Sequence, residues 1–339
     1  MADYTAILGT NTADNLIVSN TTGDDSLALL AGNDTVTGTG QIDIIDLGSG
    51  NDLLTQPGAF TGGTIIGGAG NDTVFSAAKF EGTDIDGGAN NDSIALTNTT
   101  ATFSSATLSG GLANDTISLN TTSTLLSSTV YGGGASDGSS DGADSIAVGT
   151  VSSSWLQGNA GNDTFNITKT TTSSTVRGGR DDDNISQVGS VGLAYMAGDR
   201  GGDTLIFTGA VGDGSSVYGG STDDTTNDSA DSLVFSSTIE GAEIRGNAGA
   251  DTLMLNGAVS GNTSVWGGKD SDWFTVGSTV DQSYLSGDLG SDTLFFEGTV
   301  DQTSVYGGSQ IDTTADSADS IYFAAGITQG YIQGNAGAD

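Results

Sequence analysis

Apolar and polar residues alternate in short runs along this chain, and glycine-rich turns separate the runs. Two apolar residues stand two positions apart after each turn, and another precedes each glycine. Side chains two positions apart on a strand point to the same side, so we expect these residues to face a common core. The pattern therefore predicts short strands around a thin apolar column between two parallel sheets. The expected core residues are Phe165, Ile167, Leu205, Phe207, Leu253, Leu255, Leu294 and Phe296 after the turns, and Val130, Leu156, Val176, Val217, Ile244, Val265, Leu285, Val305 and Ile332 before them.

The turns between the runs repeat. GNAGND at 158–163 recurs as GNAGAD at 246–251 and at 334–339, and looser copies lie between them. A glycine with an aspartate five positions later occurs in thirteen such turns, most of them about twenty residues apart. Self-similarity at this period is typical of solenoids, in which each repeat is one coil. We predict an all-β solenoid of about 16 coils, with two short strands per coil and Asp-rich turns stacked along one edge.

The repeat changes along the chain in three steps. Residues 1–60 have a nine-residue beat, residues 61–131 have coils of about 20 residues, and residues 132–339 form super-repeats of four coils and about 87 residues. The super-repeats carry extended acidic turns, and a tyrosine expected to be exposed precedes each turn (Tyr131, Tyr218 and Tyr306). We expect one continuous elongated domain. Because the sequence stops within a repeat, we expect it to be truncated or to be continued by another chain.

The composition is strongly acidic and contains no residues for soft-metal chemistry. The chain has 42 acidic and 7 basic residues, 55 Gly, and neither Cys nor His. Nucleic acid and anionic membrane surfaces are therefore poor partners, and no apolar run is long enough to insert into a membrane. Glu accounts for only four of the acids, which leaves 38 Asp. This preference indicates that the short carboxylate serves turn geometry or metal ligation.

Stacking of the coils would place the turn aspartates in a row. Neighbouring carboxylates about 4.8 Å apart repel each other, by about 3 to 4 kcal/mol at an effective dielectric near 20. Ca²⁺ between them would remove the repulsion, because it takes hard oxygens in flexible geometry and glycine turns offer carbonyls. The alternative is that each aspartate only caps its own turn by accepting backbone N–H hydrogen bonds. The predicted calcium ligands are Asp34, Asp52, Asp72, Asp92, Asp115, Asp163, Asp183, Asp203, Asp251, Asp272, Asp292 and Asp339.

Two features qualify these sites. The extended turns carry further candidates for Ca²⁺ or for a bridge to a neighbouring molecule, and a solvated acidic loop is the alternative. These candidates are Asp137, Asp141, Asp144, Asp224, Asp228, Asp231, Asp312, Asp316 and Asp319. The fourth motif position is expected to be left-handed, which suits Gly, Asn90, Asp181 and Asp270 but not Thr222.

The segments LAGNDTVTG and GSGNDLLTQ, and the turns GGAGND and GGANND, resemble the nonapeptide repeats of RTX (haemolysin-type) calcium-binding proteins. The resemblance covers nearly the whole chain and implies a right-handed parallel β-roll that binds Ca²⁺ in its turns. It extends to repeat-only bacterial surface-layer and gliding-fibril proteins (oscillin-like). Such a resemblance implies export by type I secretion and an extracellular or cell-surface location.

Catalysis has little support in this sequence. There is no nucleophile elbow or HExxH motif, and the seven cations look scattered. We therefore expect a non-enzymatic, calcium-stabilised structural protein that forms a surface layer or filament by head-to-tail or lateral self-association. The alternative is a secreted calcium-dependent adhesin or glycan-binding module with a cell-surface polysaccharide as partner. Trp266 and Trp273 are candidates for stacking on a carbohydrate.

Overall fold

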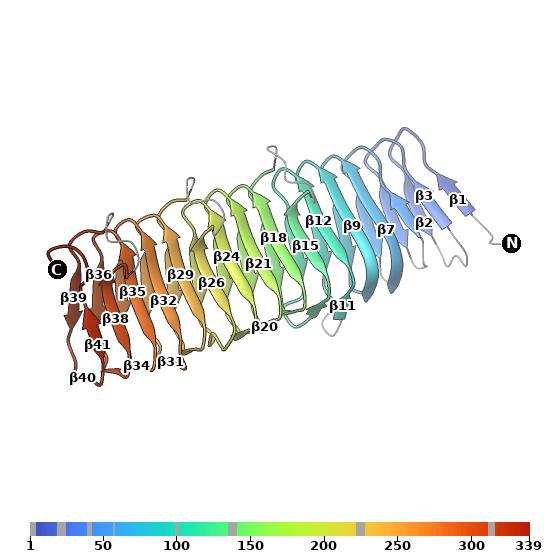
Figure 1. The fold of residues 1–339 in the computed structure, drawn as a ribbon. Coiled ribbons are helices and arrows are strands. Elements are labelled where there is room, and N and C mark those ends of the chain that lie inside the picture. Colours follow the sequence, from blue (N-terminus) through green and yellow to red (C-terminus); the bar gives the residue numbers. More distant parts are fainter. Residues whose placement is uncertain are drawn as a thin grey trace. The chain divides into compact units, whose positions relative to one another are not determined.

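The computed structural model describes residues 5–18, 25–38, 43–56, 58–98, 102–134, 141–221, 228–310 and 316–339. The chain divides into two compact units, Met1–Lys169 and Thr170–Asp339. Each unit consists of short strands joined by turns (Figure 1). The described residues contain no helix of the length and apolarity needed to span a membrane.

Three sets of parallel strands recur in both units, and we name them by their place in the coil. Sheet 1 strands lead into the Gly–Asp turn, sheet 2 strands begin directly after the aspartate, and sheet 3 strands lie in the link that returns to sheet 1. Each strand pairs in register with the equivalent strand of a neighbouring coil, as Ile65 does with Ile85. The all-β parallel solenoid with one edge of stacked aspartates is thus confirmed.

The first unit contains all three sets of strands, and its sheet 3 strands are hydrogen-bonded into the same sheet as its sheet 1 strands. Sheet 1 comprises β1 (Thr5–Leu8), β3 (Asp25–Ala28), β5 (Ile44–Asp46), β7 (Phe60–Ala69), β9 (Phe80–Ala89), β12 (Thr107–Leu112), β15 (Thr129–Gly133) and β18 (Trp155–Ala160). Sheet 2 comprises β2 (Asn15–Val18), β4 (Thr35–Gly38), β6 (Leu53–Gln56), β8 (Thr73–Ser76), β10 (Ser93–Leu96), β13 (Thr116–Leu119), β16 (Ser145–Val148) and β19 (Thr164–Ile167). Sheet 3 comprises β11 (Thr102–Ser104), β14 (Thr124–Leu126) and β17 (Thr150–Ser152).

The second unit repeats this arrangement. Sheet 1 comprises β21 (Thr175–Arg180), β24 (Tyr195–Arg200), β26 (Ser216–Gly220), β29 (Glu243–Ala248), β32 (Ser264–Lys269), β35 (Tyr284–Leu289), β38 (Ser304–Gly308) and β41 (Tyr331–Gln333). Sheet 2 comprises β22 (Asn184–Gln187), β25 (Thr204–Phe207), β27 (Ser232–Phe235), β30 (Thr252–Leu255), β33 (Trp273–Val276), β36 (Thr293–Phe296) and β39 (Ser320–Phe323). Sheet 3 comprises β20 (Thr171–Thr172), β23 (Val191–Gly192), β28 (Ile239–Glu240), β31 (Val259–Ser260), β34 (Val280–Asp281), β37 (Val300–Asp301) and β40 (Ile327–Thr328).

The core is the predicted apolar column. Of the expected core residues, all except Ile332 are buried, and Ile332 is half-buried in β41. Identical residues stack from coil to coil, as Phe207 and Phe235 do with ring centroids 4.9 Å apart. In-register stacking puts like side chains over one another along the column.

The third sheet was not expected, because the sequence predicted two strands per coil and a loose opposite link. Two strands describe the coils up to Gln56, whereas β7 and β9 extend to ten residues and later coils have a separate link strand. In these link strands only every second residue faces the core. Val259 and Val280 are examples, and both are fully buried. One inward residue is too short a signal for period-two analysis. The column is therefore bounded on three sides.

Candidate functional site: a buried aspartate ladder

Each Gly–Asp turn begins with a glycine that has no room for a side chain. A Cβ atom at Gly67 would meet the Gly87 carbonyl oxygen of the next coil and lie 2.8 Å from Asp72 Oδ2 of its own turn. Strand pairing between β7 and β9 skips this position, since it runs from Ile66 and Asp86 to Gly68 and Gly88. A carboxylate oxygen and a carbonyl oxygen therefore converge on the space that the missing side chain leaves.

The second and fourth positions of the turn have positive φ. At the fourth position, Gly70 has φ 126°, Asn90 75° and Ala113 81°, so the predicted left-handed conformation is confirmed there. The second position has the same requirement, as φ 84° at Asn159 and at Asn247 shows. Glycine and asparagine adopt this conformation at little cost, which explains why GN and GG begin most turns.

The aspartates of successive coils form a hydrogen-bonded ladder. In the first unit Asp72 N–H donates to Asp92 Oδ1 (2.7 Å), and Asp92 N–H donates to Asp115 Oδ1 (2.6 Å). In the second unit Asp231 N–H donates to Asp251 Oδ1 (2.8 Å). The expected alternative was capping of the residue's own turn, whereas in these pairs the carboxylate caps the turn of the preceding coil. Each carboxylate holds the backbone of the preceding coil in register.

The structure places most predicted site residues in this ladder. Its bonds join, in order, Asp14, Asp34, Asp52, Asp72, Asp92, Asp115, Asp144 and Asp163 in the first unit. They join Asp183, Asp203, Asp231, Asp251, Asp272, Asp292, Asp319 and Asp339 in the second. Whether these residues bind calcium remains a prediction.

Each extended turn offered three candidate aspartates, and the structure places the last of them in the ladder. Asp144, Asp231 and Asp319, at the end of each extension, accept the N–H of the ladder aspartate in the preceding coil. Asp137, Asp224 and Asp312 lie outside the described residues. The buried ladder position requires the aspartate directly before the sheet 2 strand, so the extra residues are inserted ahead of it.

The middle aspartates of the extensions fold back onto their own turn. A Cβ at Gly133, Gly220 or Gly308 would meet the carboxylate of Asp141, Asp228 or Asp316, respectively. Asp141 Oδ1 accepts the Gly142 N–H (3.1 Å), and Asp316 Oδ1 accepts the Ser317 N–H (3.0 Å). The described part of each extension is therefore tied to the solenoid.

Sequence reasoning missed two sets of ladder residues. Asp14 follows Gly9 by five positions, so the spacing itself could have identified it. The asparagine before the aspartate forms a second ladder in the opposite direction, since Asn71 N–H donates to Asn51 Oδ1 (2.9 Å) and Asn91 N–H to Asn71 Oδ1 (3.1 Å). The recurring Asn-Asp pair is the signal for this double ladder.

Burial changes the protonation chemistry of the ladder. Desolvation raises the pKa of Asp92 from 3.8 to about 8, and that of Asp144 to about 9. In the second unit desolvation raises the pKa of Asp231 and Asp272 to about 10. Neighbouring carboxylates add to the rise at each of these four residues, and the N–H donor of the preceding coil offsets part of it.

In twelve ladder residues the second carboxylate oxygen, Oδ2, is buried without a hydrogen-bond partner among the described residues. These residues are Asp34, Asp52, Asp72, Asp92, Asp115 and Asp144 in the first unit, and Asp203, Asp231, Asp251, Asp272, Asp292 and Asp319 in the second. An unpaired buried charge costs several kcal/mol, and a domain is stable by only about 5–15 kcal/mol in total. With seven Lys and Arg in the chain, twelve carboxylates need another source of positive charge.

Calcium fits the donor set that the turns present. Oδ2 and the neighbouring glycine carbonyl are hard oxygens of the kind that Ca²⁺ prefers, and the carboxylate supplies the charge. Among the described residues, no three acidic side chains group closely enough to hold a metal by themselves. Backbone carbonyls would therefore have to complete the coordination. Protons are the other neutralising species, as the raised pKa values indicate.

The cations of the chain are not scattered, as the sequence suggested. Arg177, Arg180, Arg200, Arg245 and Lys269 all lie on sheet 1 strands of the second unit. The same strands carry most of the tyrosines and Trp266. The expected exposure of the tyrosines before the extended turns is only partial, because Tyr218 is 9% exposed and packs edge-on against Tyr195.

Together, the pairing and the ladder define a parallel β-solenoid whose coils are joined by buried aspartates. No protein-family model matches the chain, and no curated protein matches it. A solved structure, described as a hyperactive, Ca²⁺-dependent, β-helical antifreeze protein from an Antarctic bacterium, is similar over 99% of this chain and 82% of that chain, with 18% identity and a TM-score of 0.45. The fold assignment rests on the strand register of the chain itself.

Proposed function

We propose that this protein is a non-enzymatic, calcium-stabilised structural protein of the bacterial cell surface. The observation that carries the proposal is the row of buried carboxylates, twelve of which have an Oδ2 atom with no hydrogen-bond partner in the described part of the chain. Outside cells calcium reaches roughly millimolar levels, at which extracellular calcium modules are occupied. Folding then couples to calcium, so that the chain becomes ordered where it is exported.

Assembly is the second part of the proposal. Solenoid coils stack through parallel strand pairing, and the same pairing joins two molecules head to tail, or their flat faces join laterally, to give a filament or layer. Side chains stack in register along each sheet, so a contact made by one coil can be made again by the next coil. This repetition supports such assembly.

Circular dichroism of the full-length protein tests the calcium part. We expect the β signal and the thermal midpoint to fall in excess EDTA and to return when Ca²⁺, but not Mg²⁺, is added. An unchanged midpoint in EDTA at neutral pH would contradict the proposal. Light scattering and electron microscopy of the calcium-loaded protein test assembly, which a stable monomer at high concentration would rule out.

A secreted adhesin or glycan-binding module is the second candidate function. The clustering of aromatic residues on sheet 1 of the second unit favours it, because soluble proteins seldom gather such side chains on one face without a ligand. This role is compatible with calcium-dependent folding.

A further inference from the structure

Sheet 1 of the second unit carries two runs of stacked aromatic side chains, separated by one coil. Tyr195 packs against Tyr218 with ring centroids 5.3 Å apart, and the chain of contacts Trp266, Tyr284, Tyr306 and Tyr331 has centroid separations of 5.6, 5.3 and 5.7 Å. Neighbouring rings come from neighbouring coils. We call these six side chains the aromatic row.

Serine alternates with the aromatic residues in the row. In four of the six coils the second outward position is a serine, as Ser216 is beside Tyr218 and Ser304 beside Tyr306, and across coils Ser264 registers with Tyr284. A large ring beside a small residue can lie along the sheet instead of standing on it. The arrangement produces a strip of rings rather than a set of isolated aromatic residues.

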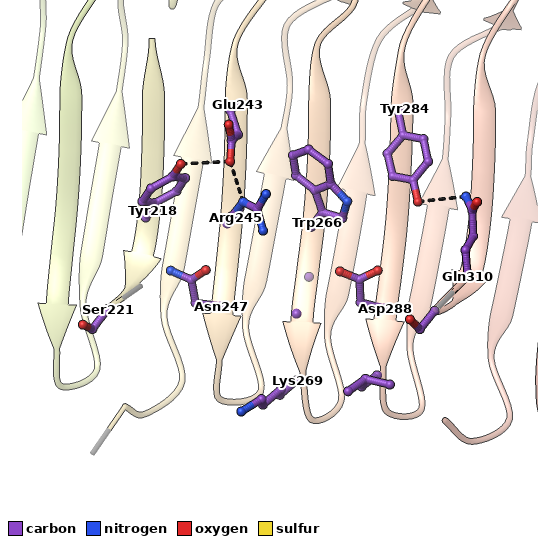
Figure 2. Close-up of a pocket in the computed structure, with 14 residues that line it drawn as sticks. Tyr218, Ser221, Glu243, Arg245, Asn247, Trp266, Lys269, Tyr284, Asp288 and Gln310 are labelled. Carbon is purple, nitrogen blue, oxygen red and sulfur yellow. Dashed lines mark hydrogen bonds and ion pairs between the residues drawn. The ribbon is translucent and has the colours of Figure 1, made fainter. Parts of the chain in front are cut away.

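One coil interrupts the row with a charged pair. Glu243 Oε1 accepts hydrogen bonds from Tyr218 Oη (2.9 Å) and Arg245 Nε (2.6 Å). The Arg245 guanidinium lies 4.3 Å from the centroid of the Trp266 ring, in cation–π contact. Figure 2 shows these side chains in line, with Trp266 between Arg245 and Tyr284.

A cavity of about 830 Å³ lies over this part of the row. Tyr218, Arg245, Trp266 and Tyr284 line it, and Asn247, Lys269, Asp288 and Gln310 lie around them. Gln310 Nε2 donates to Tyr284 Oη (3.0 Å), and Ser286 Oγ is 2.9 Å from Asp288 Oδ1. The volume is in the range of small-ligand sites, and aromatic surface with a few oriented polar groups is typical of them.

The charges of the cavity balance. It contains Arg245 and Lys269 against Glu243 and Asp288, although the whole chain has a net charge of −35. The site thus offers charged hydrogen-bonding groups of both signs in equal number. Such a site suits an uncharged ligand that has many hydroxyl groups and an apolar face.

We propose that the aromatic row binds a neutral polysaccharide of pyranose units, with sugar rings stacked on Trp266 and Tyr284. The C–H face of a pyranose covers an aromatic ring, while its hydroxyls bond to the carboxylates, amides and guanidinium beside it. Because the rings repeat from coil to coil, the site fits a linear chain rather than one sugar. The inference deepens the second candidate function and does not depend on self-assembly.

Retention on insoluble polysaccharides tests the proposal with the full-length, calcium-loaded protein. We expect at least one neutral polymer among cellulose, xylan, chitin and starch to retain it, and Trp266→Ala or Tyr284→Ala to weaken retention at least tenfold. Trp273→Ala is the matched control, because Trp273 is 50% exposed but lies on sheet 2. It should retain wild-type binding.

Tryptophan fluorescence gives a second measurement with soluble oligosaccharides of the retained polymer. The signal should change on binding in Trp273→Ala and not in Trp266→Ala. Failure of every neutral polymer to bind, binding only to alginate or polygalacturonate, or equal loss in Trp266→Ala and Trp273→Ala would overturn the proposal. Calcium-dependent circular dichroism of the same samples separates this result from failure of the structural function.

Discussion

The ladder aspartate has two oxygens with different surroundings. Oδ1 of Asp92 accepts the N–H of Asp72, whereas Oδ2 lies buried beside Gly87 with no partner among the described residues. The short side chain suits this position, because its carboxylate must stay within its own turn and still reach the preceding coil. The excess of aspartate over glutamate follows from this geometry.

Two substitutions of Asp92 distinguish the roles of its two carboxylate oxygens. Asp92→Asn keeps the Oδ1 acceptor and puts an N–H donor near the Gly110 carbonyl, so it should stabilise the first unit in EDTA, by about 1 to 3 kcal/mol, and weaken calcium binding. Asp92→Ala loses the acceptor and should destabilise the first unit both in EDTA and with calcium. Chemical denaturation with and without calcium measures these changes in the free energy of unfolding.

The control is Asp84→Asn, an exposed aspartate of the same coil. It should change the free energy of unfolding by less than about 0.5 kcal/mol. Equal destabilisation by Asp92→Asn and Asp92→Ala in EDTA would show that the charge of Asp92 is not the source of the cost.

At the scale of elements, turns and strands depend on one another across coils. The turn that follows each extended turn begins with Gly-Asn, and the asparagine side chain donates to a carbonyl at the start of the extension. Link strands likewise depend on single inward residues. An element of this fold is therefore stabilised mainly by the coils next to it.

Asn159 is an example of a turn residue that depends on a neighbouring coil. Its Nδ2 donates to the Gly134 carbonyl (2.7 Å), and its φ is 84°. Asn159→Gly loses only the hydrogen bond and should cost about 1 kcal/mol, whereas Asn159→Ala also acquires backbone strain and should cost about 1 kcal/mol more. Thermal unfolding of both variants measures the difference, and equal midpoints would exclude a role for the left-handed backbone.

Val280 is an example of a single inward residue on which a link strand depends. It is buried in β34 and pairs with Val259 and Val300. Val280→Ala leaves a cavity and should lower the free energy of unfolding by about 1 to 3 kcal/mol. The adjacent exposed Thr279 provides the control, since Thr279→Ala should have almost no effect. If both variants behave like the wild type, the link does not belong to the core.

At the scale of the whole molecule, neutralisation of the ladder is collective. Each carboxylate raises the proton affinity of its neighbours, as Asp251 and Asp292 do for Asp272. The chain therefore responds to protons and calcium through many coupled sites. Their effects on stability have opposite dependence on pH.

Without calcium, the folded pKa values are raised above the unfolded value of 3.8, to about 8 for Asp92 and about 10 for Asp231. Folding takes up protons, so stability is highest at low pH and is lost as pH rises through the folded pKa values. In EDTA the melting temperature should fall as the pH is raised from about 5 to about 9. With calcium, protons compete for the carboxylates and the trend should reverse. The same slope in both conditions would show that the ladder does not bind calcium.

The sequence by itself determined the coil. Repetition at about twenty residues, period-two apolar residues and the Gly–Asp turn predict stacked parallel strands and a row of aspartates, because each depends on local spacing. These signals recur in every coil, so that even weak evidence accumulates. They located the core residues such as Phe207 and Val265, which are fully buried.

The tertiary structure decided what no single coil contains. Which aspartate of an extended turn joins the ladder depends on the coil on either side, and so do the orphaned Oδ2 atoms and the link strands with one buried valine. The aromatic row also exists only after stacking, because Tyr218, Trp266 and Tyr284 are far apart in the sequence and meet, through Arg245, at the spacing of coils. Contacts between coils are absent from any one repeat, and only the register of the folded chain creates them.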